Sequence, residues 1–267
     1  MNIESGGRVD TLFGRRICFL AVNHNNPKLG ERGLGLRRFL AHAIQRDTIL
    51  TTCFRAGFAE HHQPLNGPFP SNTWPCSPLA GHLDDPNLAR RLRTKAAGRV
   101  DLELKYPDGD RAVAEACKLM TEQVAEPDAG VTLKLKAVPP ADYYRLVFLE
   151  RDFQLAYWHY DYPDDWFSPA GLLDPGGQEF QGRNFMRYEP STDMQQLLLL
   201  CQDRREFGVV QKAMQQLHAT FAAEMPFIPL WHLDTHALLG AGLTTVPPAA
   251  QLDPLAPFTH IEQWSLE

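Results

Sequence analysis

The segment from Ala156 to Phe167 holds the strongest concentration of side chains that could recognise a ligand. Its sequence, AYWHYDYPDDWF, has five Trp or Tyr residues and three carboxylates within twelve positions. Aromatic rings provide flat apolar walls that lose little conformational entropy on binding, and a fixed carboxylate among them adds negative charge. Such a surface suits a ligand that carries an ammonium group beside apolar side chains. An aromatic turn at the end of a core strand, with its acids in water, would have the same sequence.

Patterns typical of catalytic or metal sites are not found in the sequence. The glycines of GERGLG at 30–35 precede a predicted helix, but their order, GxxGxG, and the lack of a following strand-borne acid argue against a dinucleotide site. No GxSxG, HExxH or P-loop motif and no zinc-type Cys/His spacing occur. Cys53, His61, His62 and Cys76 could approach one another, although loop histidines are more often solvated than bound to a metal. We therefore expect a binding protein and not an enzyme, with no cofactor and no bound metal.

Length and charge limit the class of protein further. The 267 residues suffice for one large domain or two modest ones, and 44% hydrophobic with 22% charged residues is typical of a folded, soluble chain. A net charge of −6 disfavours nucleic acid as a partner of this chain. No window approaches eighteen uncharged apolar residues, so no membrane span is predicted. The N-terminus has no apolar signal region, so we expect either a cytoplasmic protein or a chain that begins inside a longer gene product.

The five cysteines are widely spaced and include no CxxC pair. Cys117 and Cys201 lie on predicted helices, where a thiol usually acts as a small hydrophobe. Cys53 and Cys76 flank a loop and could form a disulfide in an oxidising compartment.

Hydrophobic periodicity predicts an α/β layer that would position the aromatic segment. A continuous apolar run over 17–22 predicts a buried strand, and alternating patterns over 100–106 and 131–137 predict strands with one polar face. An apolar strand at 153–158 leads directly into the aromatic segment. Helices are predicted over 34–55, 113–124, 139–147, 193–200 and 207–221. The β-α-β-α-β order predicts a mixed sheet, flanked by helices, with partly parallel strands.

Several segments are less regular. The polar faces at 100–106 and 131–137 do not fit strands covered on both sides, so we expect them at an edge of the sheet. Residues 58–86 and 171–182 are predicted loops, and the proline-rich end from 244 is predicted to be extended. The short strand at 227–231 contains a proline and is expected at an edge or a bulge.

Three segments, in collinear order, resemble motifs of the family 5 extracellular solute-binding proteins, which are the dipeptide, oligopeptide and nickel receptors of ABC importers. FLAVN at 19–23, LRRFLAHAIQRD at 36–47 and FRAG at 54–57 resemble the signature FN…VRxALxxAIDRxxI…G. Residues 158–167 resemble GWxxDYPDPxxF. Residues 184–230 resemble the ending N…Y…A…D…R…Y…EDxPxIPL, and residues 253–267 resemble the C-terminus of such receptors. Gln45 stands at the place of the acid in the helix motif, and Tyr157 at the place of a glycine.

The resemblance implies the C-terminal lobe of a two-lobed, periplasmic-binding-protein type II-like fold. It predicts an N-terminal tail over 1–16, the α/β second lobe over 17–240, and an extended segment over 241–267 that returns to the first lobe. Receptors of the family are roughly twice this length, so the chain resembles a fragment whose signal lies upstream.

The same resemblance implies a ligand site around Asp161. In the family's peptide receptors the acid of the DY motif pairs with the α-amino group of the ligand, and Asp161 matches that acid. The other residues predicted to bind ligand are Trp158, His159, Tyr160, Tyr162 and Trp166. The rings of Trp158 and Trp166 could instead be structural. Arg37 and Asn184 also match motif positions, and we expect both to be structural.

The function implied is that of a substrate-binding protein of an ABC importer, with peptides as the favoured solute. Its partners would be the permease subunits and the N-terminal lobe, and it would be periplasmic or extracytoplasmic, with a possible lipid anchor. Two alternatives stay open. The same fold could be the small-molecule-sensing domain of a cytoplasmic transcriptional regulator, which five cysteines favour slightly. It could also be a receptor for a nickel or haem chelate, with His159 beside the site.

Overall fold

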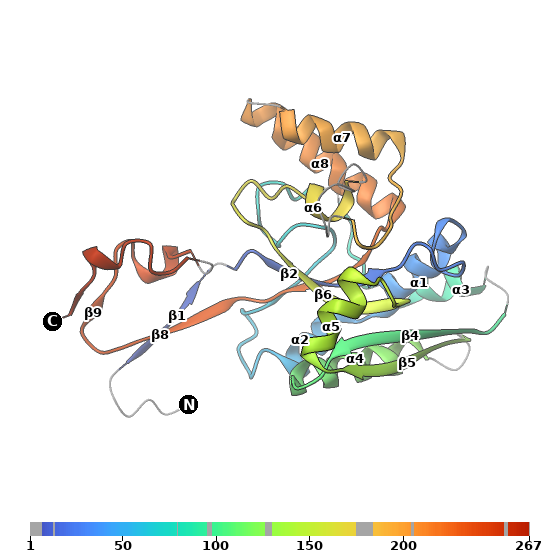
Figure 1. Cartoon of the computed structure of the whole chain (residues 1–267), viewed down its shortest axis with the longest axis horizontal. Helices are drawn as coiled ribbons and strands as arrows, with labels where there is room; N and C mark the ends of the chain where they lie inside the picture. Colours follow the sequence, from blue (N-terminus) through green and yellow to red (C-terminus); the bar gives the residue numbers. More distant parts are fainter. Residues whose placement is uncertain are drawn as a thin grey trace.

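A six-stranded mixed sheet forms the centre of the described structure (Figure 1). The computed structural model describes residues 7–12, 14–78, 80–94, 98–125, 130–174, 184–203, 206–253 and 256–266. The strands lie in the order β3-β7-β2-β6-β4-β5. They are β2 (Arg16–Val22), β3 (Gln63–Pro64), β4 (Val100–Pro107), β5 (Val131–Val138), β6 (Leu155–Asp161) and β7 (Ile228–His232). β2 is antiparallel to β6 and β7, whereas β4 is parallel to β5 and β6, which confirms the predicted mixed sheet.

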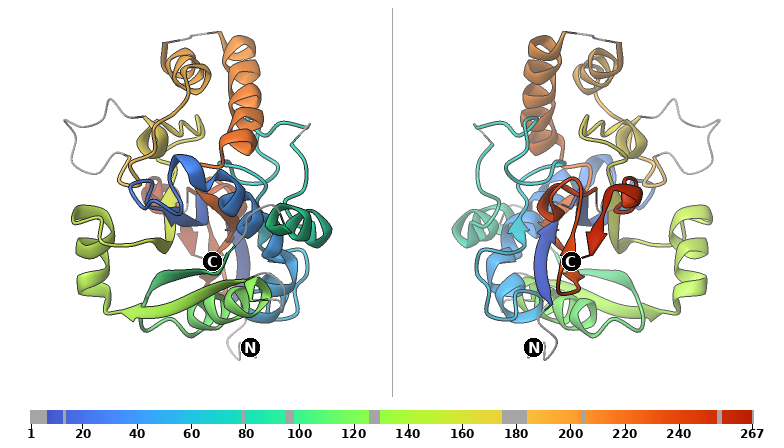
Figure 2. Two further views of the ribbon diagram at one scale, coloured as in Figure 1. Left: turned by 90° about the vertical axis from the view of Figure 1, so that its right-hand side faces the viewer. Right: turned by 90° about the vertical axis from the view of Figure 1, so that its left-hand side faces the viewer.

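Helices cover the sheet and extend beyond it. They are α1 (Leu34–Ala43), α2 (Arg46–Cys53), α3 (Pro86–Thr94), α4 (Arg111–Val124), α5 (Pro140–Tyr144) with a π-helical turn (Arg145–Leu149), α6 (Ala170–Leu173), α7 (Thr192–Asp203) and α8 (Phe207–Glu224). α4 packs on β4 and β5, and α7 pairs with α8 away from the sheet (Figures 1 and 2). None of the described helices is long and apolar enough to cross a membrane.

The polar faces of β4 and β5 are explained by ion pairs between the two strands. β5 lies at the edge of the sheet as expected, but β4 is an internal strand between β6 and β5. On the exposed face, Lys134 lies 3.6 Å from Asp101, and Lys136 lies 3.8 Å from Glu103. Opposite charges on facing positions are favourable neighbours in a sheet. The polar side chains therefore occupy the open face, while Leu102 and its neighbours on the other face are buried.

The single helix predicted over 34–55 is wrong, because the chain breaks between α1 and α2. Ile44 has an extended backbone with ψ of 110°. The Arg46 side chain, which is buried, donates hydrogen bonds to the carbonyl oxygens of Ala41 and Ile44. These bonds satisfy carbonyl groups that the end of α1 leaves without a partner. Helical periodicity continues through the break, so the pattern of apolar residues does not reveal it.

The proline-containing strand β7 lies beside the edge of the sheet and carries the expected irregularity. Its pairing with β2 shifts register, because Cys18 faces Trp231 whereas Phe19 faces Pro229. Leu230 is thereby the extra residue of a β-bulge. The two-residue strand β3 covers the outer side of β7, within the otherwise irregular segment before α3.

Both ends of the described chain differ from expectation. Residues 8–12, predicted as part of a tail, form β1 (Arg8–Leu12), which pairs with β8 (Thr235–Leu239) in a ribbon that leaves the main sheet (Figure 1). The end of the chain is not simply extended. It forms 3-10 turns and the short antiparallel pair β9 (Leu243–Thr244) and β10 (Ser265–Leu266). Apolar side chains fold this end against the ribbon in a small separate core of Leu12, Leu239, Ala249 and Leu252.

The remaining expectations concern the predicted loop at 171–182 and the cysteines. Residues up to 173 continue α6, and residues 175–183 lie outside the described residues.

All five cysteines are free, so Cys53 and Cys76 form no disulfide. Cys117 and Cys201 are buried as small apolar side chains, and burial raises the pKa of the Cys201 thiol to about 11.

Candidate ligand-binding site

β6 carries most of the residues predicted to bind ligand, and its partner strand is β2. The two strands pair in antiparallel register, with Arg16 opposite Asp161 and Cys18 opposite His159. Side chains alternate between the two faces of a strand. His159 and Asp161 therefore share one face of β6, and Trp158 and Tyr160 lie on the other.

The Trp158 ring is part of an aromatic cluster. It stacks on Phe148, with ring centroids 5.8 Å apart and an angle of 5° between the planes. It also stacks on Tyr143 at 5.6 Å and contacts Phe185 at 5.3 Å. The indole remains partly exposed. The cluster joins β6, the helical segment after β5 and the chain before α7. The three ring contacts of Trp158 therefore have a structural role.

Tyr160 and Tyr162 form a second aromatic contact. Their ring centroids lie 5.0 Å apart in an edge-to-face arrangement. Tyr162 is fully buried, and its hydroxyl donates a 2.6 Å hydrogen bond to the carbonyl oxygen of Pro68. A ligand could not reach Tyr162 without opening this contact. The role of these three rings in binding ligand therefore stays a prediction, with Trp158 and Tyr160 on the opposite face of β6 from Asp161 and with Tyr162 buried.

Asp161 instead pairs with Arg16, a residue that the sequence analysis did not single out. Arg16 Nε donates to Asp161 Oδ1 at 2.8 Å, and Arg16 Nη2 donates to Oδ2 at 2.9 Å. The side chains are 48% and 29% exposed, respectively. These bonds raise the pKa of Arg16, and partial desolvation lowers the pKa of His159, whose Nε2 lies 3.9 Å from Asp161 Oδ2. The carboxylate thus already has one cationic partner.

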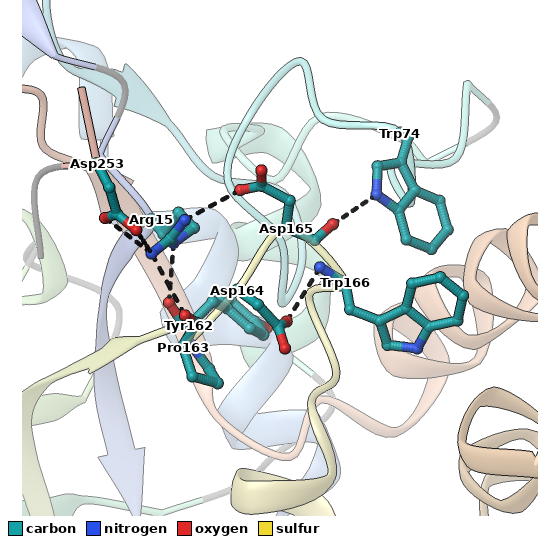
Figure 3. Close-up of polar contacts among 8 residues, drawn as sticks. All are labelled: Arg15, Trp74, Tyr162, Pro163, Asp164, Asp165, Trp166 and Asp253. Carbon is teal, nitrogen blue, oxygen red and sulfur yellow. Dashed lines mark hydrogen bonds and ion pairs between the residues drawn. The ribbon is translucent and has the colours of Figure 1, made fainter. Parts of the chain in front are cut away.

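The loop that follows β6 is attached to the rest of the molecule by Arg15 (Figure 3). Its Nε donates to the carbonyl oxygen of Tyr162 at 3.1 Å, and its Nη2 donates to that of Pro163 at 3.3 Å. Nη1 donates to Asp165 Oδ1 at 3.2 Å, and Nη2 also donates to both carboxylate oxygens of Asp253, at 2.9 and 2.8 Å. Only 9% of the Arg15 side chain is exposed. One guanidinium therefore joins the start of β2, the loop after β6 and the C-terminal segment.

Two tryptophans hold the far side of this loop (Figure 3). Trp74 Nε1 donates to the carbonyl oxygen of Asp165 at 2.8 Å. The Trp166 backbone N–H donates to Asp164 Oδ1 at 3.0 Å, and its indole packs edge-to-face on Trp74 at 5.9 Å. Trp166 is 36% exposed. It braces the loop and still offers part of its ring to solvent.

Arg37 and Asn184 are structural, as expected. Arg37 is buried and donates to the carbonyl oxygens of Met225 and Glu224, both at 2.9 Å, where it holds the end of α8. Asn184 Nδ2 donates to the carbonyl oxygen of Tyr188 at 2.7 Å, and the Tyr188 N–H donates back to Asn184 Oδ1 at 2.9 Å.

The histidines and cysteines considered for a metal site do not come together. His62 packs with His61 beside Asp234, whose Oδ2 accepts a 2.6 Å hydrogen bond from the His62 N–H. The Cys76 thiol donates to the carbonyl oxygen of Pro70. Among the described residues, no group of three or more His, Cys, Asp or Glu is arranged to hold a metal ion.

A cavity of about 700 Å³ lies between the start of α2, β3 and the segment before α3. None of the residues predicted to bind ligand lines it; its polar lining includes Arg46, Asp47, Asn66 and Asp84. Asp161 is therefore not part of the lining of this cavity.

Comparison with known families decides what kind of protein carries this site. Residues 10–180, more than half of the chain, match the model of the bacterial extracellular solute-binding proteins, family 5, middle region. The chain belongs to this family. Members of this family are solute-binding proteins, the class that the sequence motifs predict.

Solved structures share the fold of this solute-binding protein at low sequence identity. The oligopeptide-binding protein AppA from Bacillus subtilis, solved with a nonapeptide, has a TM-score of 0.80 and 14% identity, over 98% of this chain and 53% of that chain. The substrate-binding protein CtaP from Listeria monocytogenes has a TM-score of 0.80 and 19% identity, over 98% and 52%. NikZ from Campylobacter jejuni, solved with Ni(L-His), has a TM-score of 0.79 and 15% identity, over 98% and 54%.

This chain therefore spans about half the length of the solved relatives that it matches. Comparison with curated protein sequences finds no significant match.

Proposed function

We propose that this family 5 solute-binding protein contributes the C-terminal lobe of a two-lobed importer receptor for peptides. The observation that carries the proposal is the position of Asp161, a partly exposed carboxylate at the end of β6, directly before a loop that Arg15 holds in place. An accessible carboxylate of this kind can accept the ammonium group of a peptide. The peptide-bound relatives, AppA with a nonapeptide and a dipeptide-binding protein from Pseudoalteromonas sp. SM9913 with Met-Leu, support this ligand class.

In this proposal residues 17–240 form the lobe, and residues 241–267 return to a first lobe. The paired strands β1 and β8 would form part of the connection, because they leave the main sheet together with the C-terminal segment (Figure 1). Ligand binding would shift the population from an open to a closed arrangement of the lobes. Permease subunits and a periplasmic or extracytoplasmic location, with a lipid anchor, belong to the same proposal.

Substitution of Asp161 tests the ligand class. We expect Asp161→Asn, in the product of the complete reading frame, to weaken a peptide with a free amino end by about 2–5 kcal/mol, because the ammonium loses its charged acceptor. The affinity for the N-acetylated form of the same peptide should change little. Isothermal titration calorimetry measures both. An equal loss for the two peptides would show that Asp161 does not receive the amino group.

A second candidate is the sensing domain of a cytoplasmic regulator, which the five free cysteines favour. The reading frame upstream of Met1 separates the two candidates. A first lobe preceded by a leader supports the importer receptor, whereas a helix-turn-helix module without a leader supports the regulator. Ni(L-His) belongs in the same calorimetric panel, since NikZ was solved with that ligand. Binding of Ni(L-His) without any peptide binding would favour a nickel-chelate receptor, with His159 beside the site.

A further inference from the structure

We infer that Arg16 is the residue that determines selectivity for the ligand's amino end, because its guanidinium competes with an incoming ammonium group for Asp161. The inference rests on the proposed function, in which Asp161 accepts that ammonium. It adds Arg16 as a specificity determinant. It also implies that a ligand with a free amino group at this position loses binding free energy, because the ligand must displace Arg16 from Asp161.

The competition follows from the geometry of the pair. Arg16 Nε and Nη2 donate to the two different oxygens of Asp161, at 2.8 and 2.9 Å. A bidentate guanidinium–carboxylate pair is both stronger and more directional than a single contact. The register of β2 and β6 places the two residues directly opposite each other, so the pair forms without reordering the backbone. An ammonium group can form a close ion pair with the Asp161 carboxylate only by displacing at least one of these two hydrogen bonds.

The pair can be opened, because it lies at the surface. Nearly half of the Arg16 side chain is exposed, and water can solvate its guanidinium after displacement. Exposed ion pairs contribute little net stability for this reason. His159 also lies near Asp161, with Nε2 3.9 Å from Oδ2, but the distance exceeds that of a hydrogen bond. Arg16 is therefore the main competitor among the groups that contact the carboxylate.

The neighbouring arginine keeps the loop in place during this exchange. Arg15 is 9% exposed and holds the carbonyl oxygens of Tyr162 and Pro163 together with the Asp253 carboxylate (Figure 3). Arg15 precedes β2, and its acceptors are Tyr162, Pro163, Asp165 and Asp253 and not Asp161, so displacement of Arg16 leaves the contacts of Arg15 intact. Two adjacent arginines thus have separate roles: Arg15 fixes the position of the loop, and Arg16 occupies the carboxylate until a ligand replaces it.

The ligand class that follows is peptides whose free amino end binds Asp161 but gains less than it would from a carboxylate without a guanidinium partner. An N-acetylated peptide leaves the Arg16–Asp161 pair intact, whereas a free peptide gains an ion pair and loses one. Removal of Arg16 should change this balance. Arg16→Gln leaves the Asp161 carboxylate without its guanidinium partner, and the ammonium group then binds it without competition.

The experiment is calorimetry on the product of the complete reading frame, with an alanine tripeptide as the probe in free and N-acetylated forms. We expect Arg16→Gln to tighten binding of the free form about three- to tenfold and to leave the acetylated form within about twofold. Arg16→Lys keeps the charge but not the bidentate geometry, so its affinity for the free form should lie between those of the wild type and Arg16→Gln. Arg8→Gln is the matched control, because it removes one positive charge from an exposed pair with Asp10.

The outcomes separate the two proposals. If Arg16→Gln changes the affinities for both forms equally, or changes neither, the role of Arg16 is overturned. The proposal of a peptide receptor would then still hold, because both forms bind. If neither form binds any variant, the peptide ligand class fails, and the role of Arg16 fails with it. A spectroscopic readout is independent of affinity: the Arg16 Nε–H resonance should shift on addition of the free form and not of the acetylated form. A shift with both forms, or with neither, would contradict the exchange.

Discussion

Arg15 is the single residue on which the geometry of the candidate site depends most. It joins three segments that lie far apart in the sequence, through backbone oxygens of the loop after β6 and the carboxylates of Asp165 and Asp253. A buried guanidinium with this many acceptors is difficult to replace, because no other side chain offers five donors in one plane. The position of Asp161 relative to any ligand therefore depends on Arg15, although Arg15 lies too deep to contact the ligand itself.

Truncation of Arg15 should destabilise the protein and loosen this loop. We expect Arg15→Ala to lower the free energy of unfolding by about 2–3 kcal/mol, because it removes the hydrogen bonds to two carbonyl oxygens and the ion pair with the Asp253 carboxylate. Arg15→Lys should lose less, since it keeps the charge. Urea unfolding at pH 7 measures the change, and tryptophan fluorescence reports on Trp74 and Trp166, which flank the loop. Arg8→Ala, in an exposed pair, should stay within about 0.5 kcal/mol, and an Arg15→Ala protein as stable as this control would contradict the assignment.

At the same scale, the sequence reveals residue types but not their partners. Asp161 stands out because an acid among aromatic rings is uncommon, and its place in the motif matches an amine-binding acid. Arg16 precedes an apolar strand and has no signal of its own. Its contact with Asp161 depends on the register of β2 against β6, which joins residues 145 positions apart. A one-residue change in that register would place Arg16 on the other face, so the pair could not be inferred from the sequence alone.

The elements were predicted best where one periodicity continued without interruption. β2, β4 and β5 and the helices α4, α7 and α8 occur where apolar spacing predicts them. Predictions failed where a single side chain overrides the pattern, as Arg46 does at the break between α1 and α2. They also failed for β1 and β8, because each strand gains its hydrogen bonds from a partner more than 200 residues away. Local propensity cannot identify such a partner.

The contact of α6 with β6 gives a prediction at the scale of elements. A β-carbon at Gly171, in α6, would lie 2.6 Å from the Tyr160 hydroxyl oxygen, closer than van der Waals contact allows. Gly171→Ala should therefore push α6 away from Tyr160 and lower the free energy of unfolding by about 1–3 kcal/mol. Gly208→Ala is the matched control, since a β-carbon there meets no atom within 4 Å and alanine favours a helix.

Thermal and urea unfolding of both variants provide the measurement. Gly208→Ala should be neutral or stabilising by up to about 1 kcal/mol. Equal stabilities for the Gly171 and Gly208 variants would mean that α6 can move away from Tyr160 at no cost, and that the helix does not fix the ring.

For the whole molecule, three motifs in order identify the family more securely than any single segment does. The aromatic–acidic segment alone fits an ordinary turn equally well. Its combination with the motifs at 19–57 and 184–230 specifies one topology, which the mixed sheet and the match over residues 10–180 confirm. The motifs do not specify the ligand, because solved relatives of the same fold hold peptides in some cases and Ni(L-His) in another.

The partial exposure of the site leads to the last prediction, which concerns the chain as the proposed second lobe of a closing receptor. The Asp161 and Arg16 side chains are 29% and 48% exposed, and neither lines the cavity beside the start of α2. An ammonium–carboxylate pair that remains in water contributes little to the free energy of binding, whereas the same pair contributes much more when it is closed off from water. The ribbon of β1 and β8 also presents Val9 and Leu238 to solvent, at 55% and 61% exposure, on facing positions of the two strands.

We therefore expect the 267-residue chain by itself to bind the alanine tripeptide with a dissociation constant weaker than about 100 µM, because half of the contacts and most of the desolvation are missing. The product of the complete reading frame should bind at least about a hundredfold more tightly, and Asp161→Asn should remove much of that difference for the free peptide. Calorimetry on both proteins measures it. Micromolar or tighter binding by this chain alone would mean that one lobe suffices, and that closure is not the source of affinity.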